Sequence, residues 1–151
     1  MRMKQIITAI LVLTLLMSAS DHGLGGSWTI KGVKYKVNEF KPHSYSLAVS
    51  DTTMRPHAKL ILDFYRNFPA VSGTYRVAKG SPNMGEIGIG AGIPVEGKIV
   101  MYSGAGSKKE TVNVTVDKNY VTISGTNIQL ANQNNPKDLT AISLSVTTLP
   151  Q

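Results

Sequence analysis

The chain of 151 residues contains no cysteine. It can therefore form no disulfide, and it does not belong to the small secreted proteins that disulfides hold together. Thiol catalysis and cysteine-based zinc sites are excluded for the same reason. Lipid attachment behind a signal peptide is excluded too, because the lipid is carried by a cysteine. We expect a domain that a hydrophobic core stabilises and that is not lipid-anchored.

Long apolar runs are also lacking, with one exception at the N-terminus. Arg2 and Lys4 precede an apolar run from Ile6 to Met17, and the small residues Ser18-Ala19-Ser20 follow it. This order is that of a secretory signal peptide over residues 1–20. About a dozen residues are too few for a spanning helix, which needs about 20. We expect export to the periplasm or the medium, a bacterial source, and no transmembrane span after signal cleavage.

The part that remains after cleavage is short. Removing 20 of the 151 residues leaves 131, which is the size of one domain with a core of its own. We expect a flexible leader over 21–26 and a single β-domain over 27–151.

Charged residues make up only 17% of the chain, and basic residues outnumber acidic ones. Loss of Arg2 and Lys4 with the signal peptide lowers the formal net charge from +7 to +5. This balance favours an anionic glycan or an anionic surface as a partner. The one local cluster of lysines alternates with apolar residues over 31–41, as on the solvated face of a strand, and no nucleic-acid-binding signature accompanies it. Specific binding of nucleic acid is therefore not expected.

Strand patterns cover most of the chain. Apolar and polar residues alternate over 44–50, 111–116 and 142–146, and the turn Asp117-Lys118-Asn119 predicts a hairpin between 111–116 and 121–123. Within 27–37 the alternation changes parity at Gly32, which indicates a bulge or a tight turn. The segment 58–68 fits both a strand and a helix, and we favour the strand because Lys59 and Asp63 then lie opposite the leucines.

The fold class follows from these patterns. We expect an all-β protein, an antiparallel β-sandwich or a small β-barrel of about eight to ten short strands, with no substantial helix after the signal peptide. The glycine-rich segment 80–97 is expected to be a loop, with at most a short strand around 86–89.

Motifs of catalysis are few. Gly92 to Ile99 matches a phosphate-binding G-x-x-x-x-G-K sequence, but Ile99 stands where a Ser or Thr is required, so no nucleotide site is expected. His22, His43 and His57 lack the spacing of metal ligands. We therefore expect no cofactor and no metal, and we interpret the chain as non-enzymatic. A hydrolase whose two carboxylates meet only in space remains a further hypothesis.

Several short sequences resemble exported β-domains of unknown function that are common in Bacteroidota. They include the first strand around Trp28, an S-G-T-Y turn at 72–75 and an I-S-G-T strand at 123–126. The resemblance implies a β-domain and no particular activity.

A weaker resemblance is to lipocalin-like calycins. It rests on Gly26-Ser27-Trp28, which has the G-x-W form found at the first strand of those proteins. The resemblance implies a carrier of a small apolar ligand, in which Trp28 closes the floor and Tyr75, Tyr102 and Ile123 line the cavity. The leading hypothesis from the sequence is instead a non-enzymatic binding or surface-interaction module.

Overall fold

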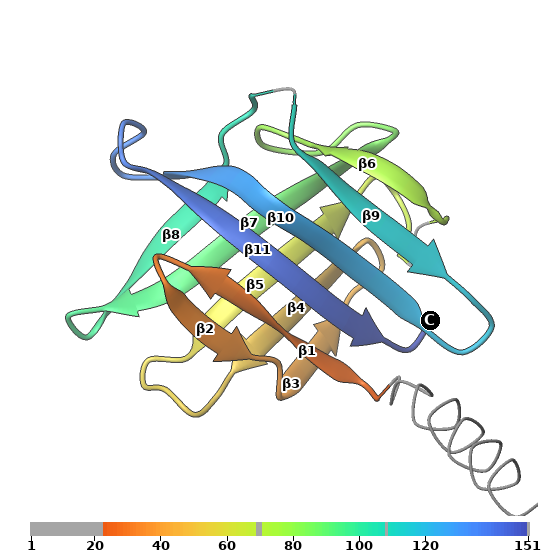
Figure 1. Cartoon of the computed structure of the whole chain (residues 1–151), viewed down its shortest axis with the longest axis horizontal. Coiled ribbons are helices and arrows are strands. Elements are labelled where there is room, and N and C mark those ends of the chain that lie inside the picture. The colour runs from red at the N-terminus through yellow and green to blue at the C-terminus, as the bar shows by residue number, and fades with distance from the viewer. Residues whose placement is uncertain (1–22, 69–70, 108, 151) are drawn as a thin grey trace, which may run out of the picture.

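The computed structural model describes residues 23–68, 71–107 and 109–150. The expected signal peptide over 1–20, together with Asp21 and His22, lies outside these residues. The described chain consists of strands and loops without a helix, which confirms the all-β fold class (Figure 1). It has eleven strands, somewhat more than expected. In chain order they are β1 (Gly25–Ile30), β2 (Val33–Lys36), β3 (Glu39–Pro42), β4 (Ser46–Asp51), β5 (Ala58–Phe64), β6 (Gly73–Val77), β7 (Glu86–Val95), β8 (Lys98–Gly104), β9 (Thr111–Val116), β10 (Val121–Asn132) and β11 (Leu139–Thr148).

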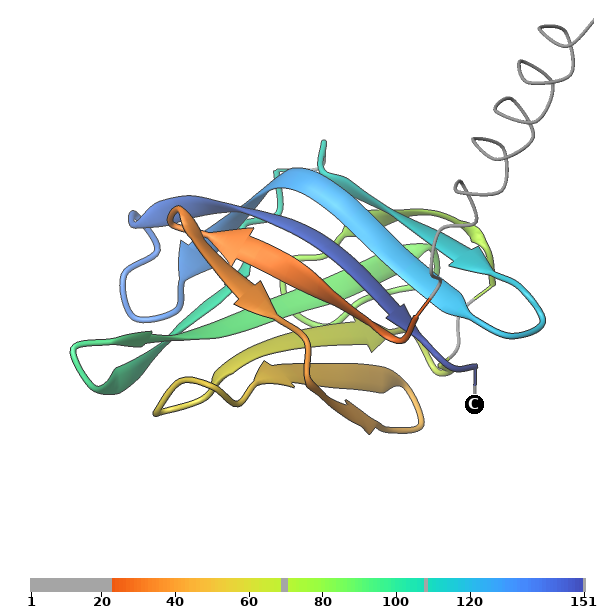
Figure 2. The same cartoon turned by 60° about the horizontal axis from the view of Figure 1, so that its bottom comes forward.

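The strands form two layers of one continuous sheet. Its order is β2-β1-β11-β10-β9-β6-β7-β5-β4-β3, and all neighbours are antiparallel except β6 and β7. In Figure 2 the layer with β10 and β11 (blue) lies over the layer with β7, β5 and β4 (green, yellow and brown). Strand β8 pairs with both β7 and β10 and so joins the two layers along one side. The opposite side, between β2 and β3, stays open.

A break in β10 makes this closure possible. The register of β10 against β11 shifts between Gly125 and Ile128, and Asn127 has a φ of +52°. The first part of β10 pairs with β9, and the part after the shift pairs with β8. A bulge bends a strand and increases its twist, so one strand can serve two neighbours in turn.

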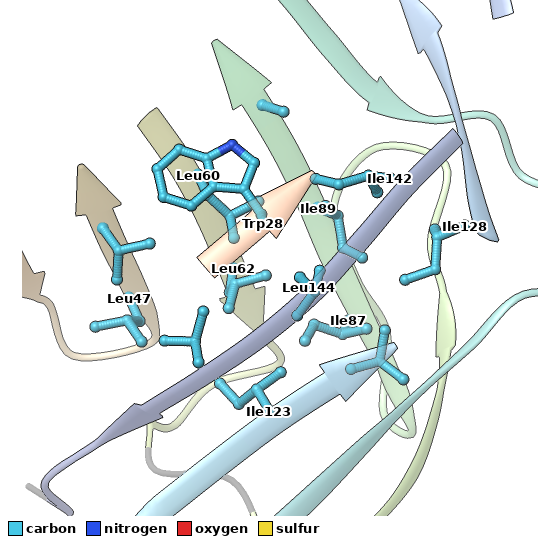
Figure 3. Packing of buried hydrophobic residues seen from close by; sticks show 14 of the residues in the cluster. Trp28, Leu47, Leu60, Leu62, Ile87, Ile89, Ile123, Ile128, Ile142 and Leu144 are labelled. Carbon is cyan, nitrogen blue, oxygen red and sulfur yellow. The ribbon is translucent and has the colours of Figure 1, made fainter. Parts of the chain in front are cut away.

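The core lies between the layers, and both layers contribute to it (Figure 3). Leu47, Leu60 and Leu62 of the β4–β5 layer face Ile123 and Leu144 of the β10–β11 layer. The leucines of β5 alternate with less buried residues, which is the period of two that the sequence shows. The favoured strand over 58–68 is confirmed for 58–64.

Two predicted turns are also present. β1 and β2 form a hairpin whose turn residues Lys31 and Gly32 have φ values of +49° and +75°, the signs that a tight two-residue turn requires. Gly32 thus marks the tight turn that the change of parity indicated. The hairpin predicted around Asp117 joins β9 to β10.

The expected loop over 80–97 is wrong for its second half. Residues 86–95 form β7, which pairs with β5, β6 and β8 near the middle of the molecule. Ile87, Ile89, Ala91 and Ile93 point into the core, and the glycines between them lie on the other face of the strand, where side chains of neighbouring segments cover Gly88 and Gly92. Strand β1 begins at Gly25, within the segment 21–26 that the sequence assigns to a leader.

Candidate functional site

A groove of about 580 Å³ lies on the outer face of strands β5, β7 and β8. We call it the outer groove. Its volume is within the range of about 300–1,000 Å³ typical of ligand pockets. It is built of backbone and side chains that point away from the core, since Leu60, Leu62 and Ile87 on the same strands are buried on the other side.

Glycines form the floor of the outer groove. Gly88 and Gly90 of β7 lie beside Asp63 and Ile61 of β5, and Gly90 also pairs with Ser103 of β8. A side chain at Gly90 would meet only ordinary contacts, because the nearest atom, Cβ of Ile61, lies 3.8 Å from the position of a Cβ. The floor at Gly90 is therefore open, and a ligand can approach the backbone there.

Asp63 supplies a carboxylate at one wall of the groove. A Cβ on Gly88 would lie 3.6 Å from Asp63 Oδ2 and 3.5 Å from Pro82 Cδ, so the carboxylate lies over the floor beside Pro82. Within the described parts of the chain it accepts no hydrogen bond and forms no ion pair. Partial burial raises the pKa of Asp63 above its usual value, since water is partly removed from the charged form.

Two tyrosines and one arginine surround the end of the groove next to β5. Tyr45 is 57% exposed and Tyr65 is 41% exposed. The guanidinium of Arg66 lies 4.8 Å from the centroid of the Tyr65 ring, in the geometry of a cation–π contact. Of the described residues that line the groove, Asp63 and Arg66 are the charged ones, so its formal net charge is zero.

A second pocket of about 450 Å³ adjoins the outer groove, and Phe64 and Tyr65 line both. We call it the end pocket. Val71 and Met84, 79% and 83% exposed, stand at it. Tyr75 also lines it, donates a hydrogen bond of 2.6 Å to the carbonyl of Val71, and meets the Phe64 ring edge to face. Burial raises the pKa of the Tyr75 hydroxyl.

The four residues that the calycin resemblance assigned to a cavity lie in different places. Trp28 and Ile123 are fully buried in the core between the layers (Figure 3). The ring of Trp28 stacks on that of Tyr35, with 5.3 Å between the ring centroids. Tyr75 lies at the end pocket. Tyr102 is buried near the β10–β11 turn.

Tyr102 belongs to a polar cluster that connects strand β8, the β1–β2 turn and the β10–β11 turn. Its hydroxyl donates a hydrogen bond of 3.1 Å to Asp138, which also accepts one from Asn132 and forms an ion pair with Lys31 at 3.4 Å. These bonds, that from Asn132 first, lower the pKa of Asp138. The cluster fastens the β1–β2 turn to the β10–β11 turn, which explains Tyr102 without a ligand.

The described part of the chain shows no group of residues that could hold a metal ion. There, no three side chains of His, Asp or Glu gather as a metal ion would require. Residues 23–68, 71–107 and 109–150 also contain no helix of the length and hydropathy that a membrane-spanning segment needs.

Comparison with family models, with curated proteins and with solved structures finds no match. The residues of the outer groove are therefore the basis on which a function can be proposed.

Sequence reasoning missed the residues that form this groove. The sequence predicts a loop with at most a short strand around 86–89 for Gly88 and Gly90, and the polar side of a strand for Asp63. The available signal was the sequence Gly88-Ile89-Gly90-Ala91-Gly92, in which every second residue is apolar and larger than its neighbours. That alternation is typical of a strand with a buried face and a bare outer face.

Proposed function

We propose that this chain is an exported, non-enzymatic binding domain that holds its ligand in the outer groove. The observation that carries the proposal is the half-buried carboxylate of Asp63 over a floor of glycines, with exposed tyrosines at its edge. A concave site with a few polar groups that lack partners within the protein is typical of ligand binding.

The chemistry of the groove supports binding more than turnover. Glycoside hydrolysis of the usual kind needs two carboxyl groups that flank the bond, and the described lining of the outer groove contains Asp63 as its carboxylate. Glu86 lines the end pocket instead, where Asn83 and Arg76 bind it. A single acid without a histidine or a second acid favours a role as a hydrogen-bond acceptor.

Export is supported by the first twenty residues of the sequence. N-terminal sequencing of the protein recovered outside the cytoplasm tests it. A mature chain that begins near Asp21 is expected, and a chain that still begins at Met1 contradicts export by signal cleavage.

Binding in the groove is tested with a library of small-molecule fragments and ¹⁵N-labelled protein by NMR. We expect fragments to shift the amide signals of residues 61–63, 88–90 and 101–104. The variant Gly90→Phe places a ring in the groove at a position where a Cβ meets no atom closer than 3.8 Å, and it should abolish these shifts. Thr115→Phe is the matched control, because Thr115 is an exposed strand residue on β9.

Two results would contradict the proposal. One is a set of fragment shifts that spread over other faces and persist in Gly90→Phe. The other is catalytic turnover of a glycan or peptide substrate by the purified protein, which would show an enzyme.

A further inference from the structure

The shape of the outer groove restricts the kind of molecule that fits it. Gly90 on its floor has no side chain, and side chains of the two neighbouring strands, each about 4.8 Å away, form its walls. A flat ring can therefore lie against the backbone at Gly90, between Ile61 on one side and Ser103 on the other.

The charges in the groove favour a neutral molecule. An anion would be repelled by the carboxylate of Asp63, and a cation would be repelled by Arg66 and by the formal net charge of +5 that the chain carries without Arg2 and Lys4. The excess of basic residues in the chain is thus absent from the groove, where the charges of Asp63 and Arg66 cancel each other. The anionic partner that the overall charge suggested has no matching site here.

The carboxylate of Asp63 calls for hydrogen-bond donors. A carboxylate is an acceptor only, and partial burial without donors is costly. Within the described residues, none donates to Asp63. Hydroxyl groups on a ligand would supply these donors, and bonds to a charged acceptor are stronger than those between neutral groups.

The aromatic side chains call for a ligand with an apolar face. Tyr45 and Tyr65 present rings that are apolar in the middle and polar at the hydroxyl. A sugar ring complements these side chains, because it has C–H groups on its faces and hydroxyls at its rim. Ser103 and Gln133 on the far wall add polar groups for that rim.

The groove also continues beyond one ring. Phe64 and Tyr65 line both the groove and the end pocket, where Tyr75 offers another aromatic ring. The hydroxyl of Thr74 at the end pocket donates to Asn113 and is left as an acceptor. We infer that the outer groove and the end pocket bind a neutral glycan of more than one sugar unit, with Asp63 as acceptor for its hydroxyls. This inference rests on the proposed function and names the ligand class of the same site.

Calorimetry and NMR with a panel of soluble glycans test the inference. The panel holds neutral oligosaccharides of glucose, mannose, galactose and N-acetylglucosamine, the anionic polymers polygalacturonate and hyaluronan, and a mixture of short peptides. We expect binding of at least one neutral oligosaccharide, with amide shifts at 61–63 and 88–90 and little dependence on salt.

Variants identify the contribution of the carboxylate. Asp63→Asn should weaken the binding of the neutral oligosaccharide about ten- to a hundredfold, because a charged acceptor is lost. Glu39→Gln is the matched control, since it removes one carboxylate charge from the exposed edge strand β3 and should leave the affinity unchanged. Tyr45→Ala should weaken binding while leaving the unfolding temperature close to that of the parent.

The outcomes separate this inference from the proposed function. If only anionic polymers or peptides shift the groove signals, or if fragments bind there and no neutral glycan binds at millimolar concentration, the glycan inference is wrong and the binding function stands. If no probe of any class shifts the groove signals, both are wrong. A neutral glycan that binds equally well to Asp63→Asn also overturns the inference.

Discussion

The carboxylate of Asp51 accepts a hydrogen bond of 2.9 Å from the backbone N–H of Lys36, and this bond joins β4 to β2 across the open side of the molecule. Asp51 is 5% exposed and also accepts bonds from the N–H and the hydroxyl of Thr53. Burial alone would raise the pKa of Asp51, but the bonds from Thr53 and Lys36 together hold it below its usual value. The pairings of β8 and of β6 with β7 thus join the layers on one side, and this carboxylate joins β4 to β2 on the other.

Replacing Asp51 by alanine should destabilise the fold. The N–H groups of Lys36 and Thr53 would lose a charged acceptor in a buried place, at a cost of about 1–3 kcal/mol in the free energy of unfolding. Because the pKa is lowered in the folded state, the contribution of Asp51 is complete above the unfolded pKa of about 3.9 and is lost as the pH falls through the folded pKa. Urea unfolding at pH 7 and pH 3 measures this, and the difference between parent and Asp51→Ala should shrink at pH 3.

The contribution of Asp63 to stability should depend on pH in the sense opposite to that of Asp51. Its pKa is raised in the folded state, so its contribution to stability is complete below the unfolded pKa and is lost as the pH rises through the folded pKa. At pH 7 the ionised carboxylate destabilises the fold, and Asp63→Asn removes this destabilisation. We expect the variant to have a higher Tm than the parent at pH 7, with a smaller difference at pH 3. A lower Tm at pH 7 would mean that the fold, and not a ligand, requires the carboxylate.

Gly26 should tolerate no side chain. It has a φ of +131°, and a Cβ there would lie 2.1 Å from the carbonyl oxygen of Ser145 in β11. Gly26→Ala should therefore lower the free energy of unfolding by about 1–3 kcal/mol or more, because β1 and β11 must separate to make room. Gly23→Ala, where nothing lies within 4 Å, is the control and should be nearly neutral. Denaturant unfolding of the two variants compares them directly.

Neighbouring residues of β7 should respond very differently to alanine. Ile89 is 3% exposed in the core, and Ile89→Ala should cost about 2–5 kcal/mol. Gly90→Ala adds a methyl group that meets only ordinary contacts, the nearest at 3.8 Å, and it reduces the freedom of the unfolded chain, so it should be neutral or stabilising by up to about 1 kcal/mol. Thermal unfolding of both variants checks the pair, and equal losses would contradict the assignment of the two faces.

The sequence predicts the parts of this fold that local rules control. The turn at Lys31-Gly32 and the hairpin around Asp117 depend on residues close together in the chain, and alternating patterns reveal β4, β9 and β11. The outer groove is different, because β5, β7 and β8 face it with residues that look ordinary in their own segments. Asp63 acquires its significance from Gly88, 25 positions later in the numbering, which the strand pairing brings opposite to it.

The composition of β7 also explains why the sequence does not predict the full strand. Glycine disfavours strands, so a segment with Gly85, Gly88, Gly90 and Gly92 suggests a loop. Pairing on both edges and four buried side chains outweigh that preference. The local tendency was real, and tertiary contacts overrode it.

The two sides of β7 differ in how much change the domain can accept. On the outward side, Gly90 has room for a Cβ. A Cβ on Gly88 would lie 3.2 Å from Asp63 Cβ, and one on Gly92 would lie 2.8 Å from Met101 Sδ. On the inward side, the buried isoleucines hold the layers together. Variation at Gly90 would therefore alter the surface of the groove and leave the core as it is, so the tolerance of this strand is concentrated at one position.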